Sequence, residues 1–161
     1  MTEQLSIFEQ QLPALFAEAA PLRFVIPGEP VAKGRPRACV IKGMARLYTP
    51  KETKEYEERV MWMAKSVMQG KPPLENALAA RIQILVSIPK SYSAKKHRSA
   101  IAGFLFPAKR PDTDNFVKAI LDGLNEIVYR DDAQIVDLYA TKRYAADPGV
   151  IVEIYPIGEG A

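Results

Sequence analysis

The sequence predicts an α+β domain in which helices pack on one small, mixed β-sheet. Segments in which apolar residues alternate, as in strands, occur both before and after segments in which they recur at helical spacing. The 161 residues, 48% hydrophobic and 25% charged, have the length and composition of one ordinary globular domain. No internal repeat or linker-like segment divides the chain. We therefore expect one domain over residues 22–161 and an N-terminal extension over residues 1–21.

The first elements can be assigned from apolar spacing and from glycine and proline. Apolar residues recur at helical spacing between Leu5 and Phe16, so the extension is expected to be helical. Residues 22–26 read as a strand that Pro27-Gly28 closes. The basic stretch at residues 30–37 (PVAKGRPR) is expected to be a loop, and residues 39–48 a hairpin that turns near Lys42-Gly43.

The clearest helix signal in the chain follows this hairpin. Thr49 is a candidate N-cap, Pro50 suits the first helical position, and Glu52 completes a capping box of the form T-x-x-E. Gly70 is expected to end the helix. Its buried face is expected to hold Tyr56, Val60, Met63, Ala64 and Val67.

The second half alternates between strands and helices. The alternation over residues 81–88 predicts a strand with one well-buried face. Asp114 is expected to cap a helix over residues 115–128, because its carboxylate can accept the free N–H groups of the first turn. The remaining expected elements are a short basic helix over 93–102 and strands over 134–144 and 150–155, on either side of an Ala-Asp-Pro-Gly turn.

The net charge of +3 conceals an uneven distribution. Residues 31–51 contain six basic side chains and residues 81–111 contain seven, with no acid in either segment, whereas residues 112–137 contain seven carboxylates. One basic segment alone would be compatible with an ordinary solvated surface, but the two together favour a polyanionic partner such as nucleic acid. The candidate DNA contacts are Lys33, Arg35, Arg37, Lys95, Lys96, Arg98, Lys109 and Arg110.

The composition also excludes several classes of protein. A single cysteine, Cys39, and a single histidine, His97, rule out an internal disulfide, zinc fingers and nuclease motifs with paired histidine ligands. Any metal must therefore bind oxygen ligands, which favours magnesium, manganese or calcium. No apolar run is long enough to span a membrane, and no basic residue precedes the first apolar positions as in a secretory signal. A cytoplasmic protein is expected.

A cluster of carboxylates carries the candidate chemistry. Asp112 and Asp114 are two residues apart, so in extended backbone their side chains point the same way, and Lys118 lies one helical turn beyond. A second acidic pair, Asp131-Asp132, follows the helix, and the chain reversal there could return it towards the first pair. Carboxylates that hold a divalent cation, with a lysine beside them, are what phosphodiester hydrolysis requires.

Other interpretations of these residues remain open. Asp114 could serve only as a helix cap, Asp131-Asp132 only as a turn, and Lys118 only in a surface ion-pair ladder between Asp114 and Asp122 worth under ~1 kcal/mol. An EF-hand is excluded because Val117 occupies the position where its loop requires glycine. There is no phosphate-binding P-loop, and no Asp/Glu-x-Lys follows where a PD-(D/E)-x-K nuclease would need it. Spacing alone thus indicates a metal-dependent enzyme that acts on phosphates.

The run PDTDNFVKAILDGLNEIVYRDDAQIVDLYATKRY resembles the signature region of the RusA family of Holliday junction resolvases, in its phage-type branch. The resemblance extends more loosely over residues 22–156, through GEPVAKGRPR and LYTPKETKEYEE, and implies a RusA-like fold. Some family members have a continuous arginine run where this chain has Lys109-Arg110-Pro111. The matching positions are Asp112, Asp114, Asn115, Lys118, Asp122, Leu124, Asp131, Asp132 and Gln134.

The resemblance implies specific roles for four of these residues. Asp112, Asp114 and Asp132 would bind Mg²⁺, for which Mn²⁺ could substitute, and Lys118 would be the catalytic lysine. It also implies a homodimer that nicks two opposing strands of a four-way DNA junction. Two other functions remain open: a junction-binding protein that does not cleave, and a nuclease for flaps or other branched DNA.

Overall fold

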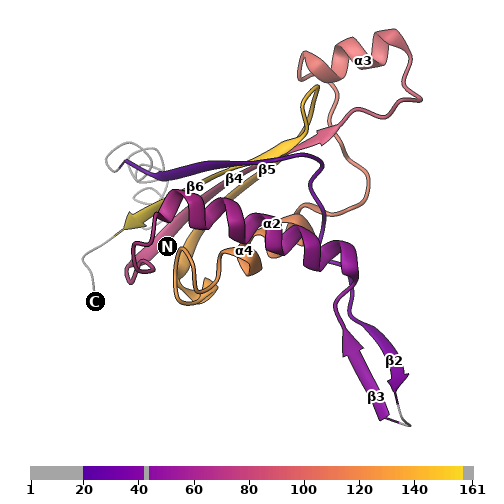
Figure 1. The fold of residues 1–161 in the computed structure, drawn as a ribbon. Helices are drawn as coiled ribbons and strands as arrows, with labels where there is room; N and C mark the ends of the chain where they lie inside the picture. Colours follow the sequence, from indigo (N-terminus) through magenta and orange to yellow (C-terminus); the bar gives the residue numbers. More distant parts are fainter. Residues whose placement is uncertain (1–19, 42–43, 158–161) are drawn as a thin grey trace, which may run out of the picture.

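The computed structural model describes residues 20–41 and 44–157, and the helix expected in the N-terminal extension lies outside these residues. Its centre is a four-stranded sheet in the order β1-β6-β4-β5 (Figure 1). β6 is antiparallel to both of its neighbours, β1 and β4, whereas β5 runs parallel to β4. The expected mixed sheet and the α+β class are therefore confirmed. The strands are β1 (Leu22–Pro27), β4 (Ala77–Ser87), β5 (Ile135–Ala145) and β6 (Gly149–Ile157).

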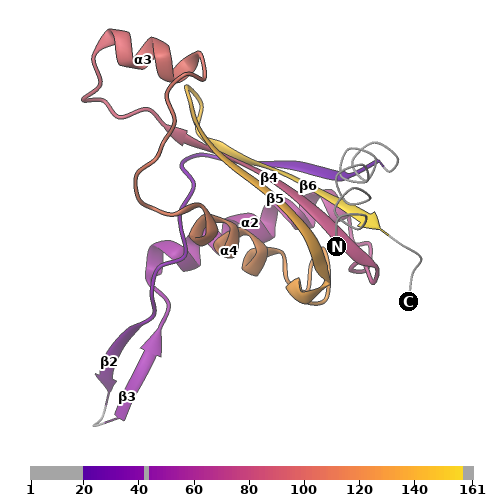
Figure 2. The same ribbon diagram turned by 180° about the vertical axis from the view of Figure 1, so that it is seen from behind.

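Two helices cover one face of the sheet: α2 (Lys51–Met68) and α4 (Thr113–Leu124) (Figures 1 and 2). The strand alternation in β4 explains the burial, because Ile82 and Ile84 are buried beneath the helices while Arg81, Gln83 and Leu85, which alternate with them, are partly exposed. The same core contains Phe24 and Ile26 of β1, Tyr56, Val60 and Ala64 of α2, Ile120 and Leu124 of α4, and Val150, Val152 and Ile154 of β6. Among the described residues, no helix combines the length and the apolar character needed to cross a membrane.

α2 and α4 touch where α4 has a glycine. A Cβ atom added to Gly123 would lie 2.8 Å from the Cβ of Val60 and 2.9 Å from the carbonyl oxygen of Glu57. These distances are too short for ordinary contacts, and the second involves backbone that cannot rotate away. Gly123 therefore sets how closely α4 approaches α2, and with it the position of the helix that carries Asp112 and Asp114.

Gly123→Ala is expected to lower the free energy of unfolding by about 1–2 kcal/mol. Overpacking costs about 1–3 kcal/mol, and the better helix propensity of alanine recovers at most ~1 kcal/mol. Urea denaturation followed by circular dichroism would measure the change. Glu58→Ala, at an exposed position of α2, is the control and should stay within about 0.5 kcal/mol. A Gly123→Ala variant as stable as the control would contradict the close helix contact.

Two parts of the chain project from this body (Figures 1 and 2). The first is a hairpin of β2 (Arg37–Ile41) and β3 (Met44–Tyr48), which forms a separate two-stranded sheet. It confirms the expected hairpin, although its expected turn at residues 42–43 lies outside the description. The second is a lobe with α3 (Ala94–Ile101), which Ser93 caps and which confirms the expected short basic helix. This lobe and α4 together form the crossover from β4 to the parallel strand β5.

Two predicted helix caps are wrong. α2 begins one residue later than expected, with Pro50 as its N-cap, and no side chain caps it, so the predicted box between Thr49 and Glu52 is not formed. α4 begins at Thr113, so its N-cap is Asp112 and not Asp114, and again no side chain caps it. Before α2 the chain stays extended one residue longer than predicted, whereas at α4 it turns helical two residues earlier than predicted, so neither start coincides with the predicted capping side chain.

The end of α4 also differs from expectation, whereas the last two expected strands are present. α4 stops at Leu124, because Asn125 leaves the helical conformation and Glu126 has a positive φ of 64°. The strands on either side of the Ala-Asp-Pro-Gly turn, β5 and β6, are present but are not neighbours, because β4 lies between them. Strand neighbours depend on contacts distant in sequence, which local alternation does not encode.

Candidate active site

The amino end of α4 presents two of the predicted carboxylates. Asp112 is the N-cap, Asp114 lies in the first turn, and both are exposed. Lys118 is exposed one turn further along the same helix. In the described part of the chain, none of these three side chains forms an ion pair, so the ladder considered between Asp114, Lys118 and Asp122 does not exist. The three groups are therefore available to bind a cation or a phosphate.

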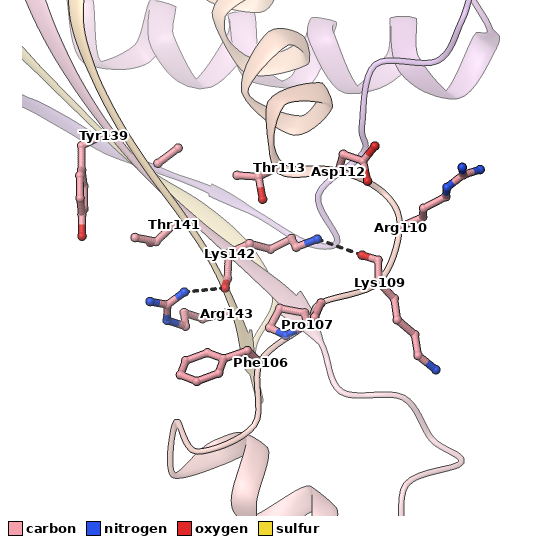
Figure 3. A pocket seen from close by; sticks show the side chains of 12 residues that line it. Phe106, Pro107, Lys109, Arg110, Asp112, Thr113, Tyr139, Thr141, Lys142 and Arg143 are labelled. Carbon is pink, nitrogen blue, oxygen red and sulfur yellow. Dashed lines mark hydrogen bonds between the residues drawn. The ribbon is translucent and has the colours of Figure 1, made fainter.

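Basic side chains surround Asp112 on two sides. One hollow of about 500 Å³ separates it from the basic loop after β1 and is lined by Lys33, Arg35, Arg110, Pro111, Asp112 and Asn115. A second hollow, of about 640 Å³, lies between the loop before α4 and β5 (Figure 3). Its wall includes Lys109, Thr113, Tyr139, Lys142 and Arg143. A carboxylate between two basic hollows suits a cation bound together with the phosphodiester that it neutralises.

Sequence analysis missed Lys142, which fixes the loop before Asp112. Its Nζ donates to the carbonyl oxygen of Lys109 at 3.0 Å and to that of Pro111 at 2.8 Å (Figure 3). Lys142 is paired with Ile84, so it lies on the face of β5 that the helices cover. The sequence does contain a signal for this role: Lys142 stands at a position of β5 where the alternation of buried residues predicts an apolar side chain. The loop that it holds also contains a cis peptide bond between Arg110 and Pro111.

An aromatic and cationic pair that the sequence did not indicate lies beside the second hollow. The guanidinium of Arg143 is 4.9 Å from the ring centroid of Phe106, and both residues are exposed. Stacked arginine and aromatic side chains are a common support for unpaired bases in proteins that bind single strands. The pair lines the second hollow together with Asp112.

The second acidic pair occupies the turn between α4 and β5. The carboxylate of Asp131 accepts a hydrogen bond from the backbone N–H of Ala133 at 2.8 Å and caps the short helix η1 (Asp132–Gln134). Gln134 fixes the turn from the other side, because its amide donates to the carbonyl oxygens of Leu74 and Asn76. Asp131 therefore stabilises the turn, which is the alternative role that the sequence left open for the pair Asp131-Asp132. Asp132 is exposed, and its carboxylate forms no ion pair with any described residue.

The two acidic pairs lie at opposite ends of α4 (Figure 2). Twelve helical residues, at 1.5 Å each, separate these ends by about 18 Å. Asp132 is instead near Tyr129, whose hydroxyl donates to Leu121. Burial, and then the charge of Asp132, raise the pKa of Tyr129. Within one chain, the turn after α4 does not return Asp132 to Asp112 and Asp114, and the described residues contain no group of three acidic, histidine or cysteine side chains able to hold a metal.

The donor set at the amino end of α4 is thus suited to a metal but incomplete. Carboxylate oxygens are the ligands that Mg²⁺ and Mn²⁺ prefer. Asp112 and Asp114 supply two such groups, and the third predicted ligand, Asp132, does not lie at this helix end. The residues present fit the predicted metal, because Mg²⁺ is often held by one or two carboxylates together with substrate phosphate.

The predicted DNA contacts fall into three groups. Arg35, Lys109 and Arg110 line the hollows around Asp112. The second group is on the projecting helix α3, where Lys95, Lys96 and Arg98 are exposed. The third group is Lys33, which lines the first hollow but is paired with two carboxylates, and Arg37, which lies in β2 with a side chain outside the description.

Comparison with known proteins supports the resemblance in the sequence. A model of the family "Endodeoxyribonuclease RusA" matches residues 27–155. The chain is also similar to "Uncharacterized protein YqaN" of Bacillus subtilis (strain 168), with 36% identity over 135 residues. That alignment covers 83% of this chain and 94% of the relative.

Proposed function

Because the chain belongs to the RusA family of endodeoxyribonucleases, we propose that it resolves four-way DNA junctions by metal-dependent, paired nicks. The observation that carries the proposal is the first half of α4, where Asp112 lies between hollows lined by arginine and lysine and is followed by the exposed, unpaired Asp114 and Lys118. Few reactions other than the hydrolysis or transfer of phosphate esters use this combination of groups.

Each group at this site has a distinct task. Asp112 and Asp114 hold Mg²⁺, or Mn²⁺ in its place; when bound, the ion neutralises the scissile phosphate and lowers the pKa of water. Lys118 stabilises the negative charge that develops on the phosphate oxygens. Arg35 and Arg110 bind the adjacent phosphates, and their planar guanidinium groups suit two oxygens at once. The exposed lysines of α3 hold a DNA arm without reading its sequence.

A second copy of the chain would supply the missing carboxylate. β5 is an edge strand that is paired only with β4 among the described strands, and its first half exposes apolar side chains, since Val136 is 61% exposed and Leu138 is 51% exposed. Long apolar edge strands readily pair with another chain. Antiparallel pairing of two β5 strands about Asp137 would place the partner subunit's Asp132 opposite Lys142, because these residues lie five positions before and after the centre.

This arrangement also matches the symmetry of the substrate. Lys142 contacts the loop that leads into Asp112, so the partner subunit's Asp132 would approach the amino end of α4. A two-fold dimer then has two complete metal sites, each built from both chains. A four-way junction has two-fold symmetry as well, so two equivalent sites can nick two opposing strands.

Incubation of the protein with a synthetic four-way junction and Mg²⁺ tests this function. We expect two symmetric nicks in opposing strands, no cleavage in excess chelator, and a loss of more than about 100-fold in Asp114→Asn. Tight junction binding without cleavage in any divalent metal would instead show a binding protein. Faster cleavage of flaps or forks than of the junction would show a nuclease for other branched DNA.

A further inference from the structure

The basic loop after β1 contains a lysine that is held between two helices. The Lys33 ammonium lies 2.6 Å from a carboxylate oxygen of Asp122, on α4, and also contacts the carboxylate of Glu57, on α2. All three side chains are three-quarters buried or nearly so, with 22% of Lys33 exposed. Burial lowers the pKa of Lys33, but its hydrogen bonds to Asp122 and Glu57 more than compensate and leave the pKa above its ordinary value. The lysine therefore remains charged and paired.

The backbone around this lysine is fixed to the same helices. The N–H of Lys33 donates to the carbonyl oxygen of Asn115, in the first turn of α4, at 2.7 Å. The N–H of Gly34 donates to the hydroxyl of Thr53, a residue only 2% exposed, at 3.1 Å. A Cβ at Gly34 would lie 2.8 Å from the Pro50 ring, so the loop approaches α2 more closely than a residue with a side chain would allow. Side chain and backbone thus fasten one short segment to both helices.

This fastening decides where the next arginine lies. Arg35 is two residues beyond Lys33 and lines the hollow that also contains Arg110, Asp112 and Asn115. The segment from residue 28 to residue 36 has no regular secondary structure, so no strand or helix of its own holds Arg35 in this hollow. Its contacts with α2 and α4 are therefore what bring Arg35 to the amino end of α4.

We propose that Lys33, Asp122 and Glu57 form an ion-pair latch that positions Arg35 to bind the phosphate at the metal site. Lys33 is then a positioning residue and not a DNA contact. The proposal rests on the proposed nuclease function, since it assigns Arg35 to that reaction. Lys33 and Asp122 lie in the sequence motifs around the site, but neither side chain is free to contact DNA. The latch gives both residues a role there.

A mutant cycle with Arg35 separates the latch from a DNA contact or a purely structural ion pair. Lys33→Met and Asp122→Asn should each lower kcat on the four-way junction by about 10- to 100-fold, because misplacing a phosphate-binding group by about 1 Å has effects of this size. Both should leave junction affinity within about threefold. In an Arg35→Gln background, Lys33→Met should cause little further loss, since its effect passes through Arg35. Lys51→Met, an exposed lysine on α2, is the matched control and should nick normally.

Two results would overturn the latch. One is a Lys33→Met variant that loses affinity and salt dependence while it keeps kcat, as a phosphate contact would. The other is full additivity of Lys33→Met and Arg35→Gln, which would mean that Lys33 does not act through Arg35.

Hydrogen exchange of the Lys33 and Gly34 amides distinguishes failure of the latch from failure of the proposed function. Exchange should be faster in Lys33→Met and in Asp122→Asn, and unchanged in Arg35→Gln. Unchanged exchange in both latch variants would overturn the latch whatever the nuclease activity. A wild-type protein that does not nick any branched DNA would overturn the proposed function.

Discussion

Two inactive variants, Asp112→Asn and Asp132→Asn, are expected to regain junction nicking when they are combined in one dimer. In a site built from two chains, the mixed dimer has one site with both defects and one site with none. Purified mixed dimers, obtained by co-expression with two different tags, should therefore nick at about half the rate of the wild-type dimer. Random mixing, in which half of the dimers are mixed, should give about a quarter. Because only one site works, the products should be single nicks and not paired ones.

Asp112→Asn combined with Asp114→Asn is the matched control. Both residues belong to the amino end of the same α4, so each site of this mixed dimer keeps one defect and no activity should return. Nicking by the Asp112→Asn and Asp132→Asn dimer, with none by the Asp112→Asn and Asp114→Asn dimer, would show that each site is built from both chains. Activity that arose merely from mixing two inactive subunits would appear in both dimers. If neither mixture nicks, Asp132 acts within its own chain, and the turn between α4 and β5 must rearrange on DNA.

The distance behind this prediction could have been estimated from the sequence alone. A helix was expected between Asp114 and Asp132, and about fourteen residues of helix span roughly 21 Å, too far for two ligands of one ion. The chain does reverse direction after α4, as expected. However, β5 begins near the carboxyl end of α4, so the reversal leaves Asp132 far from Asp112 and Asp114. The helix length was thus a better guide than the reversal.

Features that depend on short stretches were predicted well. Asp112, Asp114 and Lys118 lie within seven residues, so their closeness in sequence places all three between the N-cap and the second turn of α4, although Asp114 is helical and not extended as expected. The alternation around Ile82 and Ile84 predicted β4 and its buried face for the same reason. The helix caps failed because α2 begins one residue later and α4 two residues earlier than predicted, and the capping pattern does not specify the start to within one or two residues.

Contacts between distant segments could not be derived from spacing. Lys33 and Asp122 meet because α2 and α4 pack together through Gly123, and the sequence showed Lys33 only as part of a basic loop. Lys142 reaches Pro111 because β5 lies beside the loop before α4. Because Lys33 is paired with two carboxylates, the count of basic residues in the segment 31–51 overstated the charge available to DNA.

Lys118→Ala is expected to lower kcat by about 100-fold or more while junction affinity changes by no more than about threefold. The Lys118 ammonium lies one helical turn from Asp114 and forms no ion pair in the described part of the chain, so it is free to approach the scissile phosphate. A single group that stabilises transition-state charge contributes about 100- to 1,000-fold to rate. Its share of affinity is small because many cations contact the DNA. Single-turnover nicking with the protein in excess measures the first effect, and a gel-shift titration without Mg²⁺ measures the second.

Lys95→Ala with Lys96→Ala should show the opposite pattern. Both lysines are exposed on α3, which projects away from the amino end of α4, so they can hold a DNA arm but cannot reach the bond that is cut (Figure 1). Affinity should fall, and the slope of log K against log salt should become shallower by about 1.8, since each lost phosphate contact contributes about 0.9. The rate at saturating protein should stay close to that of the wild type. Parallel losses of affinity and rate in Lys118→Ala would place Lys118 with these binding residues, and the chemistry would then depend on the carboxylates and arginines at the helix end.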